Sequence, residues 1–168
     1  MKEYVLPVYG LKPGIHQYSF DLDQSFFDFF DSELFRKPEL KVQLELEKTS
    51  NMIMLYFNAS GSAEVMCDRC GDDMTIDIQY EEKVIVKYGE EKPAEMDEII
   101  VLLPSEHELD VSRRVYEMIA LNMPSKSVHA SIKDCNQEAI KRLSTTEEKK
   151  EDDTDPRWDA LKNLKNLK

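Results

Sequence analysis

An unbroken alternation of apolar and polar residues runs through Leu40-Lys41-Val42-Gln43-Leu44-Glu45-Leu46-Glu47-Lys48. A polar triplet, Thr49-Ser50-Asn51, follows it, and apolar residues then resume in Met52-Ile53-Met54-Leu55-Tyr56-Phe57. A period of two is typical of a strand with one buried face, and two such runs joined by a short turn form a β-hairpin. The pattern therefore predicts an antiparallel hairpin over residues 40–57.

Similar patterns predict further strands on both sides of this hairpin. They cover residues 4–9, 14–20, 62–67, 74–88 and the short apolar run 99–103, which we expect to be a buried strand. Because strands and helices do not alternate regularly, the pattern predicts an α+β fold. We expect a mainly antiparallel, curved or barrel-like sheet with a few packing helices and a tethered C-terminal helix.

Three helices are predicted within the main domain. The first follows Asp21 or Asp23 as N-cap, and we expect its phenylalanines to lie in the core. The second starts at Asp110 or Ser112 and ends near Asn122. Its expected apolar stripe consists of Val111, Val115, Met118, Ile119 and Leu121. A third, short helix is predicted over residues 135–143.

Composition limits the possible functions. With 168 residues, of which 41% are hydrophobic, the chain can build one core. Three cysteines do not suggest a disulfide framework. We find neither a signal-peptide pattern at the N-terminus nor an apolar run that could cross a membrane, so we expect a cytoplasmic protein. A net charge of −12 disfavours general nucleic-acid binding. A local basic patch could still contact RNA, or the acidic body could bind a basic protein surface such as that of a ribosomal protein, and charge alone does not choose between them.

The cysteines suggest a metal site. Cys67-Asp68-Arg69-Cys70-Gly71 has the spacing of a metal-binding knuckle, and the third cysteine lies close to a histidine in the second half of the chain. Structural zinc sites have four ligands, and three cysteines with one histidine are a common set. The candidate ligands of Zn²⁺ are Cys67, Cys70, His129 and Cys135.

Two other interpretations of these residues stay open. A thiol oxidoreductase would place the Cys-x-x-Cys pair at a helix N-terminus within a βαβ unit, whereas strand-like residues flank the pair here. The three cysteines could also be ordinary reduced thiols of a cytosolic protein, with His129 a loop histidine that binds nothing.

The C-terminal part of the chain divides into two segments. Residues 144–155 are almost all charged or hydroxylic and predict a disordered linker after a domain over residues 1–143. Asp155-Pro156 then begins a short basic helix over residues 156–168. We expect it either to pack on its own domain or to bind another macromolecule. The candidate partner-binding residues are Arg157, Trp158, Leu161, Lys162, Leu164 and Lys165.

The order of these features resembles the YceD family of bacterial and plastid proteins, which is associated with accumulation of large-subunit ribosomal RNA. The resemblance rests on residues 67–70, 99–103, 124–135 and 155–161. Many relatives carry several paired cysteines in the second half, where this chain has only Cys135. If zinc binds, His129 or a water molecule must therefore take a place that a thiolate fills in those relatives.

The resemblance implies a non-catalytic role in ribosome assembly or ribosomal RNA stability. The implied partner is a ribosomal precursor particle, ribosomal RNA or a ribosomal protein, with neither a membrane nor a small-molecule substrate. An enzyme, either a thiol oxidoreductase or a metal hydrolase, is a second hypothesis, but the chain has no Gly-rich nucleotide loop and no His-Glu-x-x-His. A third hypothesis is an acidic adaptor that binds a basic protein.

Overall fold

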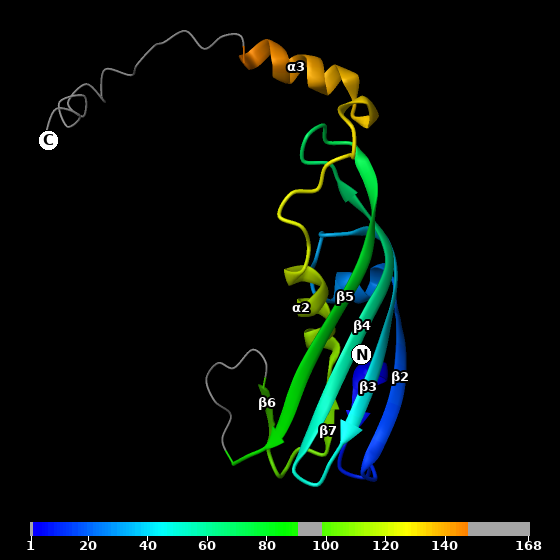
Figure 1. Ribbon diagram of the computed structural model, residues 1–168, viewed down its shortest axis with the longest axis vertical. Helices are drawn as coiled ribbons and strands as arrows, with labels where there is room; N and C mark the ends of the chain where they lie inside the picture. Colours follow the sequence, from blue (N-terminus) through cyan, green and yellow to red (C-terminus); the bar gives the residue numbers. More distant parts are fainter. Residues whose placement is uncertain (1, 91–98, 148–168) are drawn as a thin grey trace, which may run out of the picture.

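The computed structural model describes residues 2–90 and 99–147. A five-stranded sheet has the order β2-β3-β4-β5-β6, and a separate two-stranded sheet pairs β1 with β7. Neighbouring strands are antiparallel except for β5 and β6. The strands are β1 (Val5–Pro7), β2 (Gly14–Leu22), β3 (Arg36–Lys48), β4 (Met52–Met66), β5 (Asp73–Tyr88), β6 (Ile99–Leu102) and β7 (Glu108–Asp110). The described residues form a curved, open sheet, which confirms the α+β prediction without a closed barrel (Figure 1).

The predicted hairpin is present and is longer than expected. Leu44 pairs with Phe57 and Leu46 with Leu55, so that apolar residues of both strands share one face. All four side chains are buried. Thr49 closes the turn through three hydrogen bonds with Met52, one of which its backbone N–H donates to the Met52 carbonyl oxygen at 2.9 Å.

The separate strand predicted over residues 62–67 is wrong, because β4 runs without interruption from Met52 to Met66. Gly61 lies inside it with φ +145°, and a Cβ atom there would lie 2.1 Å from the carbonyl oxygen of Glu39. The register of β3 against β4 also shifts between Arg36 and Glu39. Gly61 therefore marks a close approach of two backbones and not the end of a strand.

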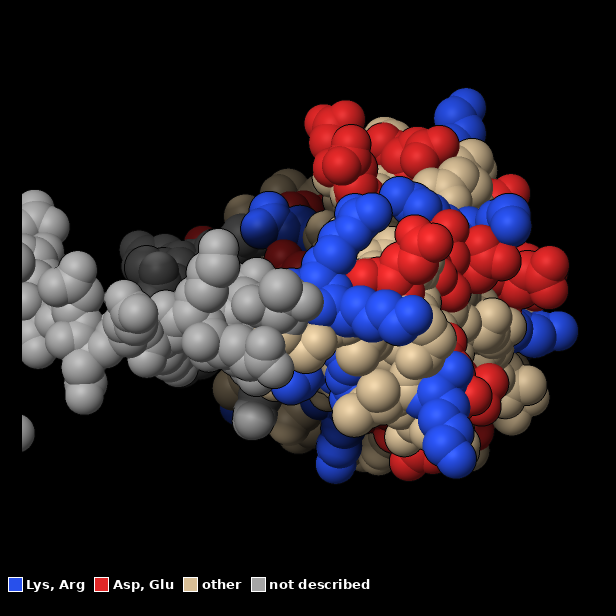
Figure 2. Space-filling model, turned by 90° about the horizontal axis from the view of Figure 1, so that it is seen from above, with Lys and Arg blue, Asp and Glu red and all other residues tan. Residues whose placement is uncertain are grey.

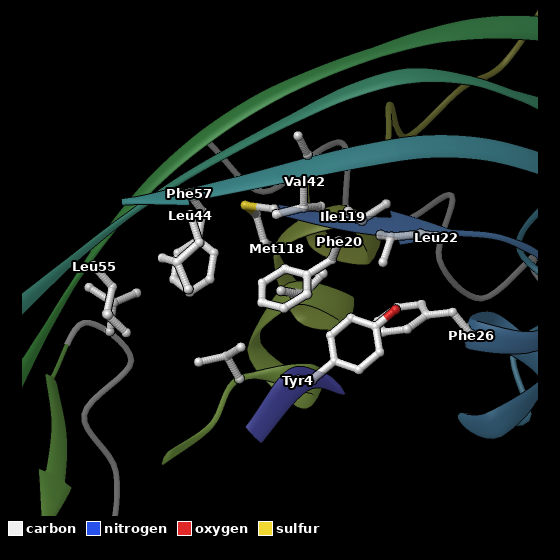
Figure 3. Packing of buried hydrophobic residues seen from close by; sticks show 14 of the residues in the cluster. Tyr4, Phe20, Leu22, Phe26, Val42, Leu44, Leu55, Phe57, Met118 and Ile119 are labelled. Carbon is white, nitrogen blue, oxygen red and sulfur yellow. The ribbon is translucent and has the colours of Figure 1, made fainter. Parts of the chain in front are cut away.

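Short elements cover the inner face of the sheet. They are α1 (Gln24–Phe29), α2 (Ser112–Leu121) and the β1–β7 pair. The rings of Phe20 and Phe26 lie 5.0 and 5.1 Å from the ring of Tyr4, beneath the apolar face of the hairpin (Figure 3). The strand predicted over residues 4–9 is present only as the shorter β1. Its partner β7 was not predicted, because a strand of three residues is too short to show a periodic pattern.

The predicted helices are present, with corrections at their ends. Asp23 caps α1, as expected, and accepts hydrogen bonds from the backbone N–H groups of Ser25 and Phe26. Phe29, however, is 61% exposed and not part of the core. In α2 the predicted stripe is buried apart from Leu121, which is 81% exposed at the last position of the helix.

The two ends of the long axis differ. The tip of the β4–β5 hairpin and α3 (Gln137–Glu147) lie at one end, and β6, β7 and the β3–β4 turn lie at the other (Figure 1). Because α3 continues to Glu147, the first four residues of the predicted linker are helical. The rest of that linker and the predicted helix 156–168 lie outside the described residues.

Strand β6 is less buried than predicted. It occupies the edge of the sheet, where it is paired only with β5, and Leu102 alone of its residues is fully buried. Within the described parts of the chain, no helix has the length and apolar character that a membrane span requires.

Candidate metal centre

The knuckle, residues 67–72, is the turn that joins β4 to β5. The N–H of Cys67 donates to the carbonyl oxygen of Asp72 at 2.8 Å, and the N–H of Gly71 donates to that of Cys67 at 2.9 Å. Gly71 has φ +80°, in the left-handed region that glycine adopts without a steric cost. These bonds reverse the chain within a few residues and place Cys67 and Cys70 close together.

Asp68 joins the knuckle to the segment that follows α2. Its N–H donates to the carbonyl oxygen of Ser127 at 2.7 Å, and its carboxylate Oδ2 accepts from the Ser127 N–H at 2.6 Å. This pair of bonds fixes the backbone two residues before His129. It explains how a histidine almost sixty residues away in the sequence reaches the two cysteines.

Cys135 is positioned by a 3₁₀-helix, Ile132–Asp134, and by the start of α3. Its N–H donates to the carbonyl oxygen of Ile132 at 3.2 Å. The next residue, Asn136, accepts from the backbone N–H of Glu138 and donates from Nδ2 to a carboxylate oxygen of Asp72 at 3.3 Å. The same asparagine therefore contacts the first turn of α3 and the knuckle.

The four predicted ligands meet at one place. Their ligand atoms all lie within 4.8 Å of one another. Nδ1 of His129 lies 3.6 Å from Sγ of Cys70 and 3.7 Å from Sγ of Cys135. Tetrahedral Zn²⁺ with ordinary bond lengths would separate a nitrogen and a sulfur ligand by about 3.6 Å and two sulfurs by about 3.8 Å. The donor set and its spacing therefore fit zinc.

The thiols influence one another's protonation. Burial alone would raise the pKa of Cys67. The Cys67 sulfur, however, accepts hydrogen bonds from the backbone N–H groups of His129, Arg69 and Cys70 and from the Cys70 thiol. These bonds have the larger combined effect and lower the pKa to about 6. For Cys135, burial and the neighbouring thiols raise the pKa, although Arg69 lowers it. Crowded thiols resist joint ionisation, and a divalent cation would remove that resistance.

Arg69 is a further functional residue at this centre. Its Nη1 donates to Sγ of Cys135 at 3.5 Å. Three thiolates and Zn²⁺ carry a net charge of −1, which a guanidinium beside one sulfur offsets. Sequence reasoning did not single out Arg69, Asp68 or Ser127. The first two lie inside the Cys-x-x-Cys motif and could have been found there, whereas nothing in the sequence marks Ser127.

The structural setting of the Cys-x-x-Cys pair differs from that of a redox pair. The Cys-x-x-Cys pair lies in a turn between two antiparallel strands and not at the N-terminus of a helix. Cys67 and Cys135 are buried, and Cys70 is half-buried. The predicted partner-binding residues, from Arg157 to Lys165, lie outside the described part of the chain.

Comparison with known proteins identifies the family. The family model described as "Large ribosomal RNA subunit accumulation protein YceD" matches residues 55–165, about two thirds of the chain, and this span includes the knuckle, His129 and Cys135. Searches of the curated proteins and of the solved structures gave no match. The family model confirms the resemblance seen in the sequence. The chain belongs to the YceD family.

Proposed function

We propose that this protein is a non-catalytic factor in ribosome biogenesis that supports the accumulation of large-subunit ribosomal RNA in the cytoplasm. The match to the YceD family model over residues 55–165 carries this proposal. The family is described by ribosomal RNA accumulation and not by a reaction. The antiparallel setting of the Cys-x-x-Cys pair supports the same view, because it lacks the helix N-terminus at which redox enzymes place such a pair.

Zinc has a structural role in this proposal. Cys67, Cys70, His129 and Cys135 would hold Zn²⁺, which supplies no chemistry beyond fixing the chain. Four protein ligands leave no open coordination position for a substrate or a reactive water. The centre would join the β4–β5 turn to the segment that leads into α3, and so set the shape of the surface offered to a ribosomal partner.

The partner is a ribosomal precursor particle, contacted through ribosomal RNA or a ribosomal protein. Seen from the α3 end, basic and acidic side chains are interleaved, and no single basic surface covers this face (Figure 2). This pattern fits a mixed particle better than bare RNA. The basic segment 156–168, with Arg157, Trp158, Leu161, Lys162, Leu164 and Lys165, would add a contact of its own.

Sedimentation tests the proposal. Tagged protein is followed through sucrose gradients of cell lysate, beside the large-subunit ribosomal RNA level of a deletion strain. We expect the protein to travel with large-subunit precursors and the RNA level to fall on deletion. Cys70→Ser should reduce both association and complementation, whereas Lys87→Glu, on an exposed position of β5, should change neither.

Two results would contradict the proposal. One is a protein that stays at the top of the gradient in cells whose ribosomal RNA is unaffected by deletion. The other is full complementation by Cys70→Ser. Recovery of ribosomal proteins after nuclease treatment, without any RNA, would instead favour an acidic adaptor that binds a basic protein.

A further inference from the structure

A cleft of about 770 Å³ lies beside the metal centre, and its residues come from four parts of the chain. They are the end of α1 with the loop after it, the last residues of β4, the knuckle, and the segment after α2. Carboxylates at the cleft outnumber cations by four to one: the lining includes Asp28, Glu33, Glu64 and Asp68 against the single Arg36.

The cleft also exposes apolar side chains. Leu34 is 44% exposed and Met66 is 59% exposed, and Met123 and Pro124 line the same space. Methionine adapts its shape to a partner at low cost. An apolar floor with a surplus of carboxylates is complementary to a peptide that carries apolar anchors and basic side chains.

We propose that this cleft binds the chain's own segment 156–168. The segment has the complementary composition, since four basic residues and one acidic residue surround Trp158, Leu161, Leu164 and Leu167. The proposal concerns the protein free of any partner and does not depend on the proposed role in ribosome biogenesis.

The connection is long enough for this contact. The cleft includes Asp68 of the knuckle, and α3 begins beside the knuckle, because Asn136 contacts Asp72 there. Helix α3 has 11 residues and leads away for about 16 Å at about 1.5 Å per residue. The eight residues 148–155 can span up to about 27 Å. The chain can therefore return past α3 to the cleft.

The outer face of the sheet is a less suitable place for the segment. Its hollow contains Lys83, and its three carboxylates, Glu45, Glu81 and Glu82, already accept hydrogen bonds from Gln17, Asn58 and Arg114. In the cleft, Glu64 pairs with Lys37 at 3.0 Å and Asp28 accepts a hydrogen bond from Gln24. Glu33, by contrast, is exposed and forms no ion pair with any described residue. Glu45 and Glu81 thus provide a matched control for charge changes in the cleft.

Tryptophan fluorescence tests the proposal directly, because Trp158 is the only tryptophan. The full-length protein is compared with a synthetic peptide of residues 148–168. We expect the protein to emit at shorter wavelengths than the peptide and to resist quenching by acrylamide. Asp28→Lys with Glu33→Lys, and separately Met66→Glu, should restore the peptide's emission and quenching. Glu45→Lys with Glu81→Lys should leave the protein's signal unchanged.

A charge exchange adds a second test. The double variant Arg157→Glu with Lys162→Glu should by itself expose Trp158 to solvent. When Asp28→Lys and Glu33→Lys are added to it, Trp158 should be protected from quenching again. Protein that emits like the free peptide would overturn the proposal. Loss of Trp158 protection in the control variant Glu45→Lys with Glu81→Lys would also overturn it. So would protection that disappears on dilution, because the segment would then bind to a second copy of the protein. Protection that requires added RNA or ribosomal subunits would also overturn it.

Discussion

The body and the knuckle end of this molecule are held together by different means. The body is formed by the inner face of the sheet with α1, α2 and the β1–β7 pair. It is held by buried apolar side chains that lie between Tyr4 and Ile119 in the sequence. The knuckle end, residues 67–72 and 123–136, is held by a few hydrogen bonds and four converging ligand atoms. We therefore expect the body to fold without an ion, and the knuckle end to become rigid when the proposed ion binds.

Removing zinc should have the largest effect, and only at the knuckle end. Apparent binding free energies of structural zinc are about 10 kcal/mol or more, so its loss should release residues 67–72 and 123–136. Hydrogen exchange, measured by mass spectrometry, should become faster in these segments after chelation. The variant Cys70→Ser should show the same faster exchange without a chelator. Exchange in β3 and β4 near Leu46 and Leu55 should stay slow. Unfolding of the body together with the knuckle end would contradict the comparison.

Truncating a core ring should instead weaken the body. Phe27 is 0% exposed and packs against Phe35 at a ring distance of 5.0 Å. Phe27→Ala should lower the free energy of unfolding by about 3–5 kcal/mol, as measured by urea denaturation, without a change in zinc content. Phe29→Ala, at an exposed position of the same helix, is the control and should stay within about 0.5 kcal/mol of the original value. An equal decrease in the free energy of unfolding in both variants would contradict the placement of Phe27 in the core and of Phe29 at the surface.

The Gly61 position should give a smaller effect, in the part of β4 that leads from the body to the knuckle. A Cβ atom there meets the Glu39 carbonyl at 2.1 Å, and φ is +145°. Gly61→Ala should cost about 2 kcal/mol or more because the two backbones must separate. Gly10→Ala, where a Cβ atom has no neighbour within 4 Å among the described atoms, should leave the urea midpoint almost unchanged. A harmless Gly61→Ala would mean that β4 is not continuous at this point.

The smallest effect should come from alkaline pH, and it should be confined to the body. Burial raises the pKa of Tyr4 to about 12, so the folded body favours the neutral phenol. Its contribution to stability is complete below about pH 10 and is lost as the pH rises toward about 12. Tyr4→Phe should flatten this alkaline loss in urea titrations, and Tyr9→Phe, at an exposed position, should not. An unchanged slope in Tyr4→Phe would contradict the assignment.

Acid should act on the knuckle end. Zinc binds its cysteine ligands as thiolates, and in the metal-free centre burial and the neighbouring thiols raise the pKa of Cys135. Protons therefore compete with the ion for these sulfurs as the pH falls. Zinc, followed with a colorimetric chelator, should therefore be released on acidification while the body stays folded.

The fold was largely predictable because its main signals are periodic. Alternation over residues 40–57 and 74–88 predicted the long strands and their buried face, and Asp23 predicted the start of α1. The errors lie in segments where the sequence shows no periodic pattern. The predicted gap between the strands 40–57 and 62–67 does not exist, and Gly61 there marks a close approach of two backbones. The three-residue strand β7 is defined only by its pairing with β1.

The four candidate ligands were also predictable, because thiols and imidazoles are few in this chain. Their surroundings were not. The Asp68–Ser127 bonds join residues 59 apart in the sequence, and Arg69 reaches Cys135 only in the folded chain. Both contacts depend on where the segment after α2 runs, and no local pattern determines that path.

The ligand pair Cys70 and His129 also has a kinetic consequence. These residues are 59 positions apart, and the chain between them includes β5, β6 and α2. Closing so long a loop in an unfolded chain costs entropy, although the cost grows only slowly with length. We expect folding of the body to bring the two ends together before an ion binds. Zinc should therefore bind late, to a chain whose body is already folded. In zinc-poor cells, newly made protein should accumulate with a folded body and an unstructured knuckle.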